Sequence, residues 1–291
     1  MTDHAARERR LGWLLVAPAA AAVVLVAAYP VLHAVWLSLQ RYDLRLPDER
    51  AFVGAANYLG VLASEVWWEA LLNTLVIAVA SVAGELVLGF AFALLMHRAL
   101  VGRRGVRVAL LIPYAIVTVV AAMAFKLAVD PATGFINPLL GADHAWLGHR
   151  WSAFAVIIAT EIWKTTPFIA LLLLAGLSLV PADLERAARV DGASARQRFF
   201  RITLPLLRPA VGVAVLFRTL DAFRIFDVVF IQTRGAQSTE TVSLVGYSTL
   251  ITRLNLGLGS AVSVLVFASM VAIAAVLIKA FGIELAREDV R

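Results

Sequence analysis

The sequence contains no cysteine, and charged residues make up only 16% of its 291 residues. The absence of cysteine excludes disulfide bonds, thiolate catalysis and cysteine-based metal sites, although it identifies no compartment. Hydrophobic residues account for 61% of the chain, and the mean hydropathy is +0.85. Soluble domains are far less apolar than this, so we predict an all-α integral membrane protein.

Phosphate-binding and metal-binding motifs are also missing. The sequence has no G-x-x-x-x-G-K-[ST] loop, so any ATP must be hydrolysed by another subunit. His97 and His144 stand alone in expected loops, and no His, Asp or Glu cluster has the spacing of metal ligands. We therefore expect a chain that is not an enzyme, with no catalytic residue, bound cofactor or metal.

Six apolar runs are long enough to cross about 30 Å of hydrocarbon, which requires about 20 helical residues. They span residues 11–39, 71–96, 106–129, 151–180, 209–232 and 256–281. The first contains Pro18 and Pro30, which we expect to bend it. We interpret it as an uncleaved helix. The alternative is a signal peptide, but the run is longer than a typical signal-peptide core.

Basic residues are distributed unequally among the segments that join these runs. Residues 1–10, 97–107, 181–208 and 279–291 contain 16 Lys and Arg, whereas residues 40–66, 131–150 and 233–255 contain six. The positive-inside rule predicts that the first set, with both termini, is cytoplasmic. This requires the fifth run to span despite its charges. We expect tails at 1–10 and 283–291 around a transmembrane domain at 11–282.

The basic residues that give the net charge of +6 mostly flank the apolar runs. The charge therefore indicates membrane topology and not nucleic-acid binding.

The cytoplasmic loop at 181–208 has the pattern of a helix, a turn and a second helix. Asp183 is a candidate N-cap for the first short helix, and the pair Asp191-Gly192 predicts the turn. Ser194 is a candidate cap for the second short helix, which we expect to end at Pro205. From composition alone the loop is either an amphipathic linker on lipid phosphates or a docking site for a protein.

Several motifs favour docking. The loop contains Glu185-Arg186-Ala187-Ala188, Asp191-Gly192-Ala193 and Phe199-Phe200-Arg201-Ile202-Thr203-Leu204-Pro205. These joined spacings resemble the EAA loop of permease subunits in ATP-binding-cassette (ABC) importers. Other segments resemble carbohydrate permeases of the maltose and glycerol-phosphate type, and trehalose importer permeases in particular. They are Phe52-Val53-Gly54-Ala55-Ala56-Asn57-Tyr58, Leu111-Ile112-Pro113-Tyr114, Gly134-Phe135-Ile136-Asn137, Trp163-Lys164-Thr165-Thr166-Pro167-Phe168, Leu220-Asp221-Ala222-Phe223-Arg224-Ile225-Phe226-Asp227 and Asn255-Leu256-Gly257-Leu258-Gly259-Ser260-Ala261.

The resemblance implies a type I ABC importer permease fold in a bacterial inner membrane. It also implies three kinds of partner: a second homologous permease subunit, a cytoplasmic ATPase dimer and an extracellular or lipid-anchored sugar-binding protein. The 181–208 segment then becomes the coupling loop, whose helix sits in a cleft of the ATPase. The matching coupling residues are Glu185, Arg186, Ala187, Ala188, Arg189, Asp191 and Gly192. Arg186 departs from the commonest family pattern, which has alanine there.

Charged residues within the spans are candidates for a substrate cavity. An ionised group at the bilayer centre costs about 2.5–3.5 kcal/mol on insertion scales, so it needs a partner or water. At about 1.5 Å per residue, Glu161, Lys164 and Asp221 all lie near the midplane. Arg218, Asp221, Arg224 and Asp227 alternate in sign at i, i+3 spacing. They either neutralise one another or line the cavity. The candidate cavity residues are Glu161, Trp163, Lys164, Asp221, Phe223, Arg224 and Asp227.

The sequence thus favours a permease subunit of an ABC importer for a carbohydrate, specifically trehalose or a related disaccharide. Two alternatives remain open. An ion- or proton-coupled secondary carrier would use Glu161 and the charges of the fifth run as coupling groups. An assembly scaffold would have no substrate. Elsewhere, we expect Glu85 to pair with a neighbouring helix and Lys126 to extend towards the membrane surface.

Overall fold

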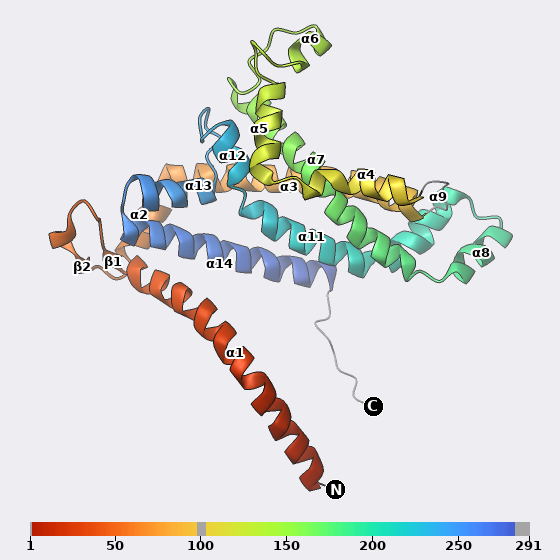
Figure 1. Cartoon of the computed structure of the whole chain (residues 1–291), viewed down its shortest axis with the longest axis horizontal. Coiled ribbons are helices and arrows are strands. Elements are labelled where there is room, and N and C mark those ends of the chain that lie inside the picture. The colour runs from red at the N-terminus through yellow and green to blue at the C-terminus, as the bar shows by residue number, and fades with distance from the viewer. Residues whose placement is uncertain (1, 98–102, 283–291) are drawn as a thin grey trace. The chain divides into compact units, whose positions relative to one another are not determined.

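The computed structural model describes residues 2–97 and 103–282, so the tail expected at 283–291 lies outside the described residues. The described chain is helical except for one small hairpin (Figure 1). It divides into two compact units. One contains Met1–Ser64 and Gly246–Val266, and the other contains Glu65–Val245 and Phe267–Arg291.

Within residues 2–97 and 103–282, four helices are long and apolar enough to span a membrane, and up to six spans result if each of two bent pairs crosses once. The four are α1 (Thr2–Ser38), α3 (Glu65–His97), α7 (Arg150–Ser178) and α14 (Leu256–Phe281). Helix α1 begins at Thr2, so the described part of the expected tail at 2–10 is an extension of this helix. The sixth expected run coincides with α14.

The third expected span is two helices instead of one. Helix α4 (Arg103–Ala115) and helix α5 (Thr118–Ala128) meet at 95° (Figure 1). The break falls in a β-branched run, where Val117 adopts an extended conformation (φ −59°, ψ 135°). Valine, isoleucine and threonine lose side-chain freedom in helices, so this segment leaves the helix at low cost.

The fifth expected span is also interrupted. Helix α11 (Arg208–Phe223) ends before α12 (Asp227–Gln232) begins, and Phe226 between them has φ −135° and ψ −60°. The last turn tightens, because the backbone nitrogen of Arg224 donates to the Asp221 carbonyl and that of Ile225 to the Ala222 carbonyl. A broken helix at membrane depth is tolerated where it lines a polar cavity.

Short elements complete the described chain. They are β1 (Gln40–Arg41), the 3₁₀ helix η1 (Pro47–Glu49), β2 (Ala51–Phe52), α2 (Ala56–Leu62), α6 (Ile136–Leu140), α8 (Ala182–Val190), α9 (Ala195–Arg198), the π-helix η2 (Phe199–Thr203), α10 (Leu204–Leu206), α13 (Val242–Tyr247) and the π-helix η3 (Ser248–Thr252). Strands β1 and β2 are antiparallel, with Gln40 opposite Phe52.

In the first unit, the residues of the F-x-G-x-x-N-Y element fasten the hairpin to the end of α1. The Asn57 side-chain amide donates to the carbonyls of Ser38 and Gln40, both at 2.8 Å. The Tyr58 hydroxyl lies 2.5 Å from the Ser38 hydroxyl. Gly54 has φ +56°, a left-handed conformation that glycine adopts without steric cost. The motif therefore satisfies carbonyls that the end of α1 leaves free.

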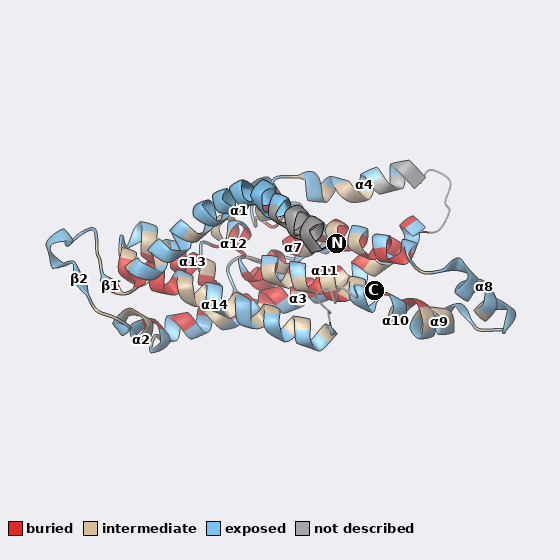
Figure 2. Cartoon of the chain, turned by 90° about the horizontal axis from the view of Figure 1, so that it is seen from below, coloured by how far each residue is buried: buried red, intermediate tan, exposed pale blue. Residues whose placement is uncertain are grey.

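In the second unit, α3, α7 and α11 pack against one another, and their facing sides carry most of the buried residues (Figure 2). One apolar cluster includes Ile77 of α3 and Ile157 of α7, and another includes Ala93 and Ile169 of the same helices. The stretch of α3 and α7 between these clusters holds buried polar residues, which form the site described below.

Helices α3 and α7 approach closely because α3 carries Gly84 and Gly89. A Cβ atom on Gly89 would lie 2.7 Å from Ile169 Cγ2 and 3.4 Å from the Ala170 backbone nitrogen, and one on Gly84 would lie 2.5 Å from Ile162 Cδ1. The 2.7 Å distance is too short for a real contact, so the Ile169 side chain or α7 would have to shift. The absence of a side chain on α3 therefore sets the distance between the two helices.

We predict that Gly89→Ala lowers the stability of the purified protein by about 1–3 kcal/mol through overpacking, despite the better helix propensity of alanine. Ile169→Ala removes the clashing Cγ2 atom, so Gly89→Ala should cost less in an Ile169→Ala background than in the wild type. Gly60→Ala is the control, because no atom lies within 4 Å of its new Cβ. Thermal unfolding in detergent compares the wild type, the three single variants and the double variant. Equal melting temperatures for Gly89→Ala and wild type would contradict the prediction.

Candidate substrate cavity and coupling loop

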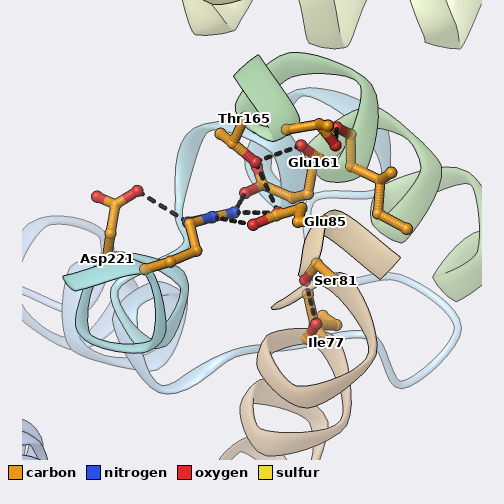
Figure 3. Close-up of polar contacts among 9 residues, drawn as sticks. Ile77, Ser81, Glu85, Glu161, Thr165 and Asp221 are labelled. Carbon is orange, nitrogen blue, oxygen red and sulfur yellow. Dashed lines mark hydrogen bonds and ion pairs between the residues drawn. The ribbon is translucent and has the colours of Figure 1, made fainter. Parts of the chain in front are cut away.

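Arg218 of α11 lies at the centre of the buried polar site, with only 2% of its side chain exposed. Its Nε donates to Glu85 Oε2 at 2.7 Å and its Nη2 to Glu85 Oε1 at 2.9 Å, which is a bidentate pair with α3. Nη2 also donates to Glu161 Oε2 of α7, and Nη1 donates to Asp221 Oδ2 at 2.8 Å. In Figure 3 these carboxylates approach from three different helices.

The Thr165 hydroxyl completes this arrangement on α7. Its oxygen lies 2.6 Å from Glu85 Oε1 and 2.6 Å from the Glu161 carbonyl oxygen (Figure 3). A buried guanidinium is stable only when its donors are bonded and its charge is compensated, and here three carboxylates share that task. The expectation that Glu85 pairs with a neighbouring helix is confirmed, and the partner is Arg218.

The alternating charges of the fifth run do not form one ladder. Arg218 and Asp221 pair at i, i+3, as expected. Helix α11 ends at Phe223, however, so helical spacing no longer relates Arg224 and Asp227 to them. Arg218 instead makes its additional ion pairs with α3 and α7.

Two cavities adjoin the Arg218 site. The larger, here called the aromatic cavity, has a volume of about 400 Å³ and is lined by Tyr114, Thr165, Phe168, Phe217, Arg218, Leu220, Asp221, Arg224 and Met270. The smaller, here called the charged cavity, has a volume of about 150 Å³ and is lined by Thr118, Glu161, Lys164, Thr165, Asp221, Arg224, Ile225, Phe226, Asp227 and Val228. Thr165, Asp221 and Arg224 belong to both, so the cavities share one polar wall.

Five of the seven candidate cavity residues meet in the charged cavity: Glu161, Lys164, Asp221, Arg224 and Asp227. The other two lie elsewhere. Phe223 has 0% exposure and is a core residue at the end of α11. Trp163 lines a separate apolar cavity of about 630 Å³, where its ring lies 5.6 Å from that of Phe125. Their helical positions turn them away from the shared polar wall.

Other aromatic residues take the place of these two. The rings of Tyr114 and Phe168 stack with centroids 5.8 Å apart, and Lys164 Nζ lies 5.6 Å from the centre of the Tyr114 ring. Sequence reasoning missed them as cavity residues. The spacing in the sequence could have indicated Phe168, because it follows Glu161 by two helical turns and so lies on the same face of α7.

Lys126 makes a contact that was not predicted from the sequence. Its Nζ donates to the carbonyl of Ile231 at 2.9 Å, near the C-terminal end of α12. A cation at this position satisfies a carbonyl that the helix leaves free. Lys126 thus joins α5 to α12, and its expected extension towards the membrane surface stays a prediction.

The coupling loop has the expected helix, turn and helix, with corrected boundaries. Helix α8 begins at Ala182 after Pro181, so Asp183 lies in its first turn and does not cap it. It pairs instead with Arg186 at 3.3 Å. The Ser194 cap is confirmed, because its side chain accepts from Gln197 N in a reciprocal capping box. Pro205 does not end the second helix, since a proline is tolerated in the first turn of α10.

Helix α8 is exposed on nearly all sides. It has no buried residue, and in Figure 2 it is coloured mostly as exposed. The turn after it depends on Gly192, which has φ +78°, and on the backbone nitrogen of Ala193, which donates to the Ala188 carbonyl at 2.9 Å. Ala187 is exposed and Ala188 half-buried, whereas Glu185 and Arg189 border a pocket of about 480 Å³ against the end of α7.

Comparison with known proteins identifies the family. Residues 85–283 match the family described as binding-protein-dependent transport system inner membrane component. The chain belongs to this family. This permease is 52% identical over 275 residues to the trehalose transport system permease protein SugA of Mycobacterium tuberculosis, a match that covers 94% of the chain and 90% of the relative. It is 39% identical to the trehalose/maltose transport system permease protein MalF of Thermococcus litoralis, covering 94% of both chains.

The fold of this permease also matches solved structures of ABC importers. It aligns with a chain of a bacterial alginate ABC transporter in complex with an alginate pentasaccharide-bound periplasmic protein, with a TM-score of 0.81 and 19% sequence identity. The alignment covers 96% of this chain and 98% of the other. The predicted fold class, a helical membrane protein like ABC importer permeases, is therefore confirmed.

We predict that Glu85→Ala destabilises the permease by about 3–5 kcal/mol, because it leaves the buried Arg218 charge undercompensated. Glu69→Ala is the matched control. Its ion pair with Arg150, at 3.1 Å, is partly exposed on both sides. It should contribute only about 0–1 kcal/mol. Thermal unfolding of the detergent-solubilised proteins measures the difference, and equal losses for the two variants would contradict the central role of the Arg218 site.

Proposed function

We propose that this permease is the transmembrane subunit of an ABC importer that moves a carbohydrate, specifically trehalose or a related disaccharide, into a bacterial cell. The observation that carries the proposal is the polar wall shared by the aromatic and charged cavities. Carboxylates and guanidinium groups exchange hydrogen bonds with sugar hydroxyls, and aromatic rings pack against the apolar faces of sugar rings. The names of the SugA and MalF relatives support trehalose as the substrate class.

The proposed assembly follows from what this chain contains. It has no phosphate-binding loop, so we assign ATP and magnesium to an ATPase dimer on the cytoplasmic side, where the basic residues place both termini and the coupling loop. A second homologous permease completes the translocation path. An extracellular or lipid-anchored binding protein delivers the sugar, as the periplasmic protein in the alginate transporter structure suggests. The complex resides in the inner membrane.

Energy enters through the coupling loop in this proposal. The exposed face of α8, with Glu185, Arg186, Ala187, Ala188 and Arg189, docks in a cleft of the ATPase, and the Asp191-Gly192 turn fixes the direction in which the chain returns. The charge of Arg186 is already partly compensated by Asp183 at 3.3 Å. Closure of the ATPase dimer then moves α8, and the helices on either side of the loop reorient the cavities.

The decisive experiment reconstitutes the complex in proteoliposomes with sugar-loaded binding protein outside. Uptake is then measured either with ATP inside the vesicles or with a proton gradient alone. We expect uptake only with ATP. Glu185→Ala and Gly192→Val should each reduce both ATPase association and uptake at least tenfold, the latter because valine is strained at φ +78°. Glu49→Ala, in the exposed 3₁₀ helix η1, is the control. Uptake driven by a proton gradient without ATP would favour a secondary carrier instead.

We further predict that Phe168→Leu and Tyr114→Leu lower the uptake rate at saturating binding protein about three- to tenfold, since an aromatic contact contributes about 0.5–1.5 kcal/mol beyond its buried area. Phe135→Leu is the control, because Phe135 lies on the separate apolar cavity. Rates are normalised to the amount of assembled complex. If the uptake rate fell equally in the control and in the two cavity variants, the aromatic cavity would not be the path of the sugar.

A further inference from the structure

Arg218 links the two helices that enter and leave the coupling loop. Helix α7 leads directly into α8, and α11 follows α10 after Leu207 alone. At about 1.5 Å per residue, Glu161 lies roughly 26 Å before the end of α7, and Arg218 lies about 15 Å after the start of α11. The ion pair between them therefore joins both arms of the loop at some distance from it, and Glu85 attaches the same point to α3.

The three carboxylate partners differ in their access to the cavities. The side chains of Glu85 and Glu161 are 0% and 8% exposed, whereas that of Asp221 is 62% exposed. Asp221 also lines both cavities. A ligand can thus reach the pair at Asp221, whereas the bond of Arg218 to Glu85 is shielded from it, and Glu161 borders only the charged cavity with little of its side chain exposed.

Hydroxyl groups compete directly for this exposed pair. A sugar hydroxyl can donate to the Asp221 carboxylate and accept from Arg218 Nη1, because an ionised aspartate only accepts and a guanidinium only donates. The bidentate bond to Glu85 and the bond to Glu161 remain in place during such an exchange. Arg218 and Asp221 both belong to α11, so the exchange changes the pairing within the last turns of this helix, while the α3–α7–α11 junction persists.

We propose that Arg218 is a positioning residue that transmits occupancy of the cavities to the coupling loop. Its bonds to Glu85 and Glu161 form a fixed junction about which α11 reorients, and its bond to Asp221 is the contact that the ligand replaces. Because α11 continues into the coupling loop, a change at Asp221 shifts the loop against the ATPase. This role rests on the proposed import function. It belongs to a residue that is not among the seven candidate cavity residues predicted from the sequence.

The test uses the full complex with its partner permease, ATPase subunits and binding protein in proteoliposomes. The readout is the ratio of trehalose taken up to ATP hydrolysed, per assembled complex. Arg218→Lys keeps the charge but loses the planar fork that bonds Glu85 and Asp221 together. We expect this ratio to fall at least tenfold in Arg218→Lys and at least threefold in Asp221→Asn. Arg45→Lys is the control, because Arg45 also pairs with an aspartate, Asp43 at 2.6 Å, but is 60% exposed.

The outcomes separate this proposal from the import function. If the wild-type complex takes up no sugar with ATP, the proposed function fails first. If wild type imports sugar and Arg218→Lys changes only the amount of assembled complex, Arg218 is a structural residue and the inference is overturned. Should Arg218→Lys not assemble, Asp221→Asn decides the question, because its amide occupies the same volume at an exposed position. An unchanged ratio in that variant also overturns the inference.

Discussion

The arrangement of the second unit depends on compensating one positive charge in a low-dielectric interior. Arg218 has an exposed fraction of 2%, and a charge in that position costs several kcal/mol unless it is paired. Its guanidinium plane offers donors in fixed directions, so its partners must arrive at one level from different helices. Glu85 and Glu161 do this from α3 and α7, and apolar clusters lie on either side of the pair.

Two backbone features make this junction possible and keep it next to a cavity. Gly84 and Gly89 let α3 approach α7 closely enough for both carboxylates to reach one guanidinium. The end of α11 at Phe223 then interrupts the helix just beyond Asp221, and Arg224, the next residue, lines the shared polar wall. Close packing on one side and a broken helix on the other thus place a buried ion pair at the edge of a polar cavity.

The sequence predicted features that depend on composition and missed those that depend on where helices end. Long apolar runs identify spans because the bilayer imposes their length, and α14 matches its run at both ends. The breaks at Val117 and between α11 and α12 were not predicted, because the hydropathy of a run carries no information on its local backbone conformation. Helical spacing paired Arg218 with Asp221 but not with Glu85, because the spacing rule relates only residues on one helix.

The exposed state of α8 has a mechanical consequence. A helix with no buried residue derives little of its position from packing within its own chain, so its orientation is determined by the segments that lead into and out of it. Those segments are α7 and the α9–α11 stretch, and they meet again at Glu161 and Arg218. In the proposed mechanism, displacement of α8 changes the angle between these two segments. The buried ion pair, and not the loop itself, is in that proposal the element that converts motion of α8 into a change of the cavities.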